Sequence, residues 1–285
     1  MDRNHEPLDS QGAARALIWW AEAGGGFTLN ERPTDRFAAP AAIPDRPADR
    51  AAPPAPSVRP SPEAPARRET ARHSGGPAPA AATELAGSAE DLPALRAALE
   101  RFEGCALKKT ATQLVFSDGV PGSRVMFVGE APGADEDRIG RPFVGRAGQL
   151  LDRMLAAIGL DRSQVYIANV VPWRPPGNRT PTPEETQACL PFIRRQIELA
   201  APEILVCLGL PSAQTLLGIR TGITRARGSW FTYEQGDGRA IRAIAMLHPA
   251  YLLRQPSQKR AAWADMRALA AALAAPSPDV SAARE

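Results

Sequence analysis

Short apolar runs alternate with amphipathic stretches through the second half of the chain. The apolar runs predict buried parallel strands, which we expect at residues 124–129, 165–170, 204–209 and 241–247. The amphipathic stretches predict helices at residues 147–158, 183–200, 211–217 and 258–274. Thr182 and Pro183 mark the start of the second helix. We therefore expect an α/β fold, a three-layer α/β/α domain with a central four-stranded parallel sheet.

Polar or glycine-rich residues follow every predicted strand. They are the GEAPG segment at 129–133, Asn169, Gly209, and His248 with the proline that follows it. The carboxyl ends of parallel strands meet at one edge of an open sheet, and ligands bind in the crevice at that edge. We therefore expect the functional residues of this domain to lie there.

The first 82 residues have a different character. Residues 10–23 place apolar side chains on one helical stripe, which predicts a short docking helix, or else a marginal helix that frays. Twelve of the 29 prolines fall between Pro33 and Pro79, mixed with Ala and Arg, which predicts a disordered linker. We expect an N-terminal segment at 1–32, this linker at 33–82, a folded domain at 83–275 and a disordered tail at 276–285.

Charge and cysteine content narrow the class of protein only loosely. Lys and Arg number 34 against 31 Asp and Glu, and the residues after Ala82 hold 24 against 21, so the excess of +3 lies in the folded domain. This excess permits binding to nucleic acid without requiring it. The three cysteines form no C-x-x-C pair, and no signal peptide or membrane-length apolar run is evident. These features predict a cytoplasmic protein.

The 17 residues from 130 to 146 form an unusually long connection between the first strand and its helix. Their glycines and prolines fix a sharp backbone course, and the helix N-terminus that follows offers free N–H groups to an anion or a polar ligand. Neither the phosphate-loop pattern nor the dinucleotide-binding glycine pattern is present. A nucleotide-metabolising enzyme is therefore disfavoured.

Three further features each allow a structural and a functional interpretation. Asn169 interrupts an apolar strand, where its amide either bonds a neighbouring loop or reads the edge of a base. His248 is either a structural cap or, if it shares a crevice with Glu130 and Asn169, a functional group. Residues 250–254 either wedge into a base stack or pack Leu252 under the last helix.

Four spaced motifs, in the same order, resemble those of the type-4 uracil-DNA glycosylases. They are GEAPG at 129–133, GRPFVG at 140–145, Asn169 with RPPGNR at 174–179, and HPAY at 248–251. The resemblance covers roughly residues 102–269. It implies a DNA-repair enzyme that hydrolyses the N-glycosidic bond of uracil in DNA and leaves an abasic site, as in base excision repair.

The resemblance also implies catalytic roles for three residues. Glu130 would position or activate the attacking water and favour a positively charged sugar, Asn169 would hydrogen-bond the pyrimidine edge, and His248 would stabilise the departing base. These residue types suit the reaction, because positive charge develops on the deoxyribose and negative charge on uracil O2.

Substrate and DNA contacts are implied at other positions. Phe143 would stack on the extruded uracil, and Glu136 would crowd its C5 position and so exclude thymine. Ala131 and Gly133 would bring the backbone close to the base. The residues implied to contact DNA are Ser212, as a phosphate ligand, and Leu252, Leu253 and Arg254, as support for the flipped-out state.

One departure from the family concerns its [4Fe–4S] cluster, which four cysteines commonly hold. At the four matching positions this sequence has Phe102, Cys105, Trp173 and Cys189. Two thiolates cannot replace four. We therefore expect no cofactor and no metal, and we interpret the two aromatic residues as filling the volume that the cluster would occupy.

The sequence thus predicts a glycosylase that acts as a monomer on uracil-containing DNA. We expect it to be monofunctional, because no amine is evidently placed as a Schiff-base nucleophile. The alternative is a lesion-binding protein that holds uracil-DNA without turnover. No partner for the N-terminal helix can be identified from the sequence.

Overall fold

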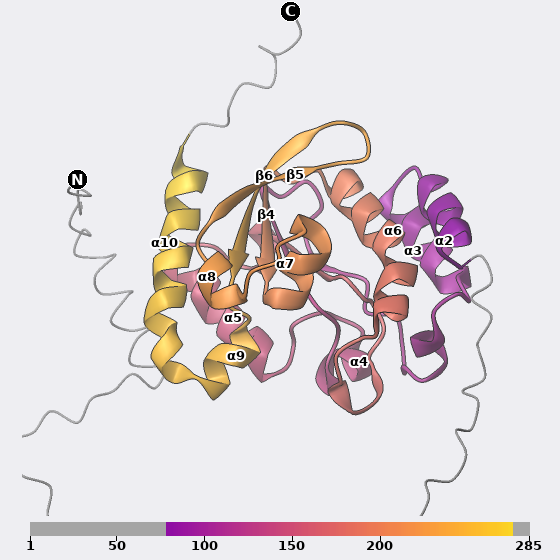
Figure 1. The fold of residues 1–285 in the computed structure, drawn as a ribbon, viewed down its shortest axis with the longest axis horizontal. Helices are drawn as coiled ribbons and strands as arrows, with labels where there is room; N and C mark the ends of the chain where they lie inside the picture. The colour runs from indigo at the N-terminus through magenta and orange to yellow at the C-terminus, as the bar shows by residue number, and fades with distance from the viewer. Residues whose placement is uncertain (1–77, 276–285) are drawn as a thin grey trace, which may run out of the picture. The chain divides into compact units, whose positions relative to one another are not determined.

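The computed structural model describes residues 78–275 (Figure 1). They are built around one mixed sheet of six strands in the order β1-β3-β2-β4-β6-β5. The four central strands are parallel: β3 (Tyr166–Asn169), β2 (Val125–Gly129), β4 (Ile204–Leu208) and β6 (Ala240–Met246). Antiparallel edge strands are added by β1 (Asp118–Gly119) and β5 (Trp230–Glu234).

The expectation of a four-stranded sheet was therefore wrong in strand number, although the four predicted strands are the parallel centre. Both missed strands lie at the edges. The two residues of β1 are too few to give a pattern, and most of β5 is partly or fully exposed. Edge strands of this kind lack the continuous apolar run that marks a strand buried on both faces.

Helices cover both faces of the sheet (Figure 1). One face packs against α2 (Ala78–Gly87), α3 (Leu92–Arg101), α6 (Pro183–Ala200) and α7 (Leu210–Leu217). The other packs against α5 (Arg146–Ala157), α9 (Pro249–Arg254) and α10 (Lys259–Ala274). Successive residues of β2 alternate between the two cores, because side chains of a strand point to opposite faces. The predicted three-layer α/β/α fold is confirmed.

The remaining helical elements are short. They are α4 (Ala134–Ile139), α8 (Ile223–Ala226), and the 3₁₀ turns η1 (Ala106–Lys109), η2 (Arg162–Gln164), η3 (Pro176–Asn178) and η4 (Pro256–Gln258). Helix α4 lies inside the segment that the sequence suggested to be one long loop. Among the described residues, no helix has the length and apolar character needed to cross a bilayer.

The expected domain boundary at residue 82 falls inside a helix. Helix α2 begins at Ala78, and Ala82 is fully buried in the core with α6. The helix expected at 10–23, the linker up to residue 77 and the tail at 276–285 lie outside the described residues.

The strand order creates a crevice at the carboxyl ends of β2 and β4. The chain leaves β2 toward β3 on one side, whereas it leaves β4 toward β6 on the other. Adjacent strands whose following segments diverge leave an opening between them, which is where open α/β sheets bind ligands.

Candidate active site

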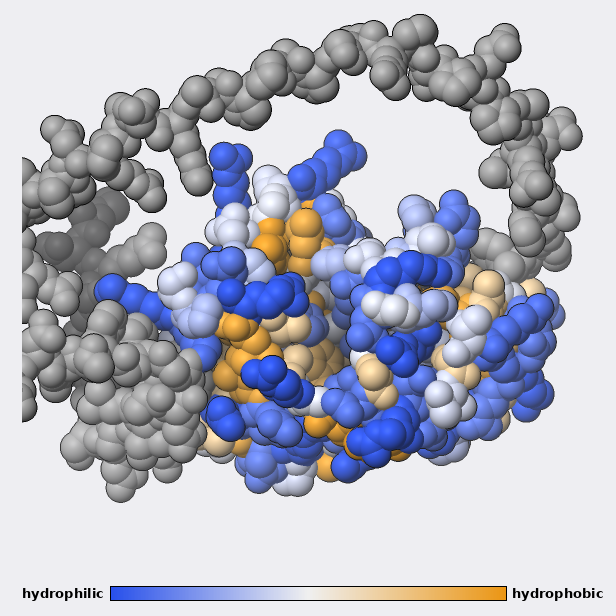
Figure 2. Space-filling view, turned by 90° about the horizontal axis from the view of Figure 1, so that it is seen from below, coloured by the Kyte–Doolittle hydropathy of each residue, from blue (hydrophilic) through white to orange (hydrophobic). Residues whose placement is uncertain are grey.

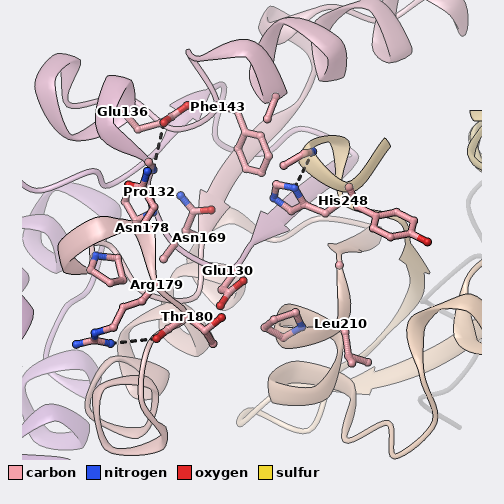
Figure 3. A pocket seen from close by; sticks show the side chains of 18 of the residues that line it. Glu130, Pro132, Glu136, Phe143, Asn169, Asn178, Arg179, Thr180, Leu210 and His248 are labelled. Atoms are coloured by element: carbon pink, nitrogen blue, oxygen red, sulfur yellow. Dashed lines mark hydrogen bonds between the residues drawn. The ribbon is translucent and has the colours of Figure 1, made fainter. Parts of the chain in front are cut away.

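A pocket of about 580 Å³ lies in this crevice, within the size range of small-molecule sites. Figure 2 shows this end of the molecule, where apolar residues gather in a hollow bordered by hydrophilic ones. The pocket is lined from the ends of all four parallel strands, including Glu130 after β2, Asn169 in β3, Gly209 after β4 and His248 after β6 (Figure 3). The crevice predicted from the sequence is thus present.

Phe143 and Asn169 meet over Gly129, the last residue of β2. A Cβ atom at Gly129 would lie 2.4 Å from Asn169 Oδ1 and 2.7 Å from Phe143 Cζ. Only glycine allows both side chains to lie this close to the strand. The Phe143 ring also stacks on the His248 ring, with centroids 5.5 Å apart and planes inclined at 29°. An aromatic face, an amide and an imidazole therefore converge on one pocket.

His248 is held in one orientation by the start of α9. Its Nδ1 accepts a hydrogen bond of 3.0 Å from the backbone N–H of Ala250, so the side chain caps the helix. Desolvation by the surrounding protein, with Arg254 nearby, lowers the pKa of the imidazole to about 4. At neutral pH the ring is uncharged, and with Nδ1 accepting, its proton is assigned to Nε2. His248 is thus both a cap and a potential donor.

Glu130 is the acidic group of the pocket with an unsatisfied oxygen. Its Oε1 is buried without a hydrogen-bond partner among the described residues. Burial raises the pKa of this carboxyl above its ordinary value, and a hydrogen bond with Thr180 offsets part of that shift. A buried carboxylate with a free lone pair is suited to accept a proton from a water molecule or to face a developing positive charge.

Glu136 has its carboxylate occupied by the backbone. Oε1 accepts from Val144 and Gly145 N–H at 2.9 and 2.8 Å, and Oε2 accepts from Gly133 N–H at 3.1 Å. These bonds tie the start of α4 to the segment that follows Phe143. Glu136 lines the pocket, as do Ala131 and Gly133, and its visible task is to fix the pocket wall.

Two of the implied DNA contacts do not fit the structure. Ser212 is fully buried, and its hydroxyl donates to the Leu208 and Gly209 carbonyls at 2.9 and 3.2 Å, so it has no access to a phosphate. Leu252 is fully buried in the core that includes α10, which bears out the packing alternative. Both assignments are corrected: chain position alone did not reveal that these side chains point inward. Arg254 is exposed and lines the pocket, whereas Leu253 is half-buried beside the same core.

The sequence analysis missed the contribution of Thr180. It lines the pocket with Arg179 and Asn178 and hydrogen-bonds Glu130. Its position directly after the RPPGNR motif was the available signal. Arg179 is anchored by two bonds to Glu185 at 2.7 and 2.8 Å, which links this loop to the first turn of α6.

The cysteine positions do not fit an iron–sulfur cluster. Cys105 and Cys189 are buried and hydrogen-bond each other, and this contact together with burial raises the pKa of Cys189. The other two family positions, Phe102 and Trp173, are buried in the same core, where the Phe102 ring lies 4.9 Å from that of Phe192. A [4Fe–4S] cluster needs four ligands, and aromatic carbon atoms supply none.

Comparison with known proteins agrees with the geometry. The model of the uracil DNA glycosylase superfamily matches residues 116–267. The chain belongs to this superfamily. It is 46% identical over 156 residues to the type-4 uracil-DNA glycosylase of Archaeoglobus fulgidus. The aligned region covers 53% of this chain and 78% of the relative. The type-4 enzyme of Thermotoga maritima is 43% identical over 162 residues, covering 56% and 82% of the two chains.

A more distant superfamily member is also similar. The type-5 uracil-DNA glycosylase of Pyrobaculum aerophilum is 32% identical over 148 residues, covering 46% of this chain and 62% of that one. The stronger similarity to the type-4 enzymes agrees with the four motifs, so within the uracil DNA glycosylase superfamily the chain belongs with the type-4 group.

Proposed function

We propose that this chain removes uracil from DNA by hydrolysing the N-glycosidic bond, leaving an abasic site. The observation that carries the proposal is the convergence of Glu130, Asn169, Phe143 and His248 on one pocket at the carboxyl edge of the sheet. A base can enter this pocket only after it leaves the duplex stack, so the reaction requires an extruded nucleotide.

Each group has a distinct task in this reaction. Phe143 offers its ring as a stacking surface for the base, and the amide of Asn169 pairs with the donor and acceptor of the uracil edge. As the bond between C1′ and N1 breaks, negative charge moves onto uracil, where the neutral Nε2–H of His248 donates to O2. Glu130 faces the sugar, orients water toward C1′ and receives its proton.

The proposal is tested with purified full-length chain and end-labelled oligonucleotides, single- and double-stranded, that carry one uracil. We expect strand breaks at the uracil only after alkali, because a monofunctional glycosylase leaves the backbone intact. An otherwise identical oligonucleotide with thymine is the control. Intact DNA that stays bound to the protein would instead support the lesion-binding alternative, and intact unbound DNA would contradict both.

We further propose that the domain folds and acts without an iron–sulfur cluster. This is supported by the burial of Phe102 and Trp173 in the same core as Cys105 and Cys189. Anaerobically purified protein is expected to contain far less than one iron per chain and to lack the visible absorption of a cluster. An iron content near the roughly four atoms of a [4Fe–4S] cluster would refute this.

The same chain is proposed to act as a cytoplasmic monomer. The three cysteines are free thiols, as expected in a reducing compartment.

A further inference from the structure

Arg162 lies outside the pocket lining and holds the backbone of the aromatic residue in the pocket wall. Arg162 is the first residue of the 3₁₀ turn η2. Its Nη2 donates to the carbonyl oxygen of Phe143, and its Nη1 donates to that of Pro142 at 3.1 Å. The guanidinium is itself held by two carboxylates: Nε donates to Asp152 Oδ1 at 2.7 Å, and Nη1 donates to Asp118 Oδ2. One side chain thereby connects β1, α5 and the loop before α5.

The backbone at Phe143 needs such support. Its φ is +55°, a left-handed conformation that is disfavoured for a residue with a Cβ atom and persists only where the surroundings fix it. This conformation directs the ring toward Gly129 and His248. A relaxed backbone at this residue would carry the ring away from both.

A second contact converges on the same carbonyl oxygen. A Cβ atom at Gly148, in the first turns of α5, would lie 1.6 Å from the oxygen of Phe143. Glycine therefore leaves the space that this carbonyl occupies, and Arg162 supplies its donor. The sequence motif around Phe143 shows neither requirement, because Arg162 lies 19 residues downstream.

We propose that Arg162 is a positioning residue for uracil excision, which acts by fixing the Phe143 carbonyl and hence the ring that stacks on the base. The inference rests on the proposed function. Lysine cannot reproduce the role fully, because its single ammonium group lacks the fork that reaches two carbonyls and two carboxylates together. The alternative is an ion-pair cluster that stabilises the fold without affecting the ring.

The test is a double-mutant cycle in the full chain, read by single-turnover excision from a uracil oligonucleotide. Arg162→Gln is expected to slow excision by about tenfold to a hundredfold, since misplacement of a binding group by about 1 Å has such effects. In a Phe143→Ala background the same substitution is expected to change the rate by less than about twofold, because the ring through which it acts is gone. Arg162→Lys should recover part of the loss.

Arg124→Gln is the matched control, because Arg124 also joins a carboxylate, Glu203, and a backbone carbonyl, Leu273, but precedes β2 at the opposite end of the sheet. It should leave the rate per folded molecule unchanged. An equal loss for Arg162→Gln in both backgrounds would overturn the inference, as would a loss no larger than that of the control. If Arg162→Gln does not fold, Asp152→Asn replaces it, since it removes only the half-exposed partner. Absence of excision by the unsubstituted chain would refute the proposed function instead.

Discussion

Replacing Glu130 by Gln is expected to reduce single-turnover uracil excision by about 10²- to 10⁴-fold, the usual contribution of a positioned general base. Glutamine keeps the shape of the side chain and its contact with Thr180. It removes the charge that faces the sugar and the lone pair that receives the proton of water. The measurement is the rate of abasic-site formation with enzyme in excess over labelled oligonucleotide.

The Tm of the Glu130→Gln variant should rise or remain unchanged. The buried Oε1 of Glu130 has no partner among the described residues, so its charge is costly in the folded state, and an uncharged amide relieves that cost. A large loss of activity without a loss of Tm would separate a catalytic role from a structural one. Glu203→Gln, which removes a surface carboxylate paired with Arg124, is the matched control and should retain the rate.

The pH dependence of excision gives an independent check on Glu130. Because burial raises the pKa of its carboxyl, the group is protonated on acidification at a higher pH than an ordinary glutamate. The active form is ionised, so the rate should fall as pH decreases through this raised pKa and remain level above it. The acidic limb should disappear in Glu130→Gln. Wild-type rates in that variant, or an unchanged limb, would contradict the assignment.

Replacing His248 by Asn is expected to slow excision by about 10²- to 10³-fold, the cost of removing one donor to a developing oxyanion. Asparagine is chosen because it can still cap α9 through its side-chain oxygen, while it lacks the ring nitrogen that reaches the pocket. The loss should appear in the single-turnover rate more than in DNA affinity, since charge on uracil O2 develops only as the bond breaks.

The protonation state of His248 can be measured directly. With a pKa of about 4, its ring resonances should not titrate between pH 5.5 and 8, the range in which an ordinary imidazole with a pKa near 6.5 does. Between about pH 4 and pH 6.5 the His248 imidazole is protonated in the unfolded chain but not in the folded one. The free energy of unfolding should therefore decrease as pH falls from about 6.5 toward 4. His248→Asn should remove that part of the decrease. Titration near pH 6.5 would show that the ring is hydrated and would contradict the lowered pKa.

Local pattern determined the architecture at the centre of the molecule. Strands β2 and β4 are continuous buried runs, because helices cover both faces of the sheet, and burial on both faces is visible in the sequence. Thr182 and Pro183 fixed the start of α6, where Thr182 accepts from the N–H of Glu185. The carboxyl-edge position of Glu130, Asn169 and His248 followed from their place at the ends of predicted parallel strands, without knowledge of any contact.

Side-chain direction and long-range contacts were decided only by tertiary structure. Ser212 and Leu252 stood in segments beside the site, but helix rotation turned both inward, and no local pattern distinguishes one helical face from the next in elements this short. The raised pKa of Glu130 and the lowered pKa of His248 arise from desolvation by residues distant in the chain. Phe143 has a left-handed backbone, and the fold alone brings Arg162 and Gly148 to its carbonyl oxygen. The sequence by itself therefore determined which residues reach the catalytic edge, and packing determined their orientation and charge.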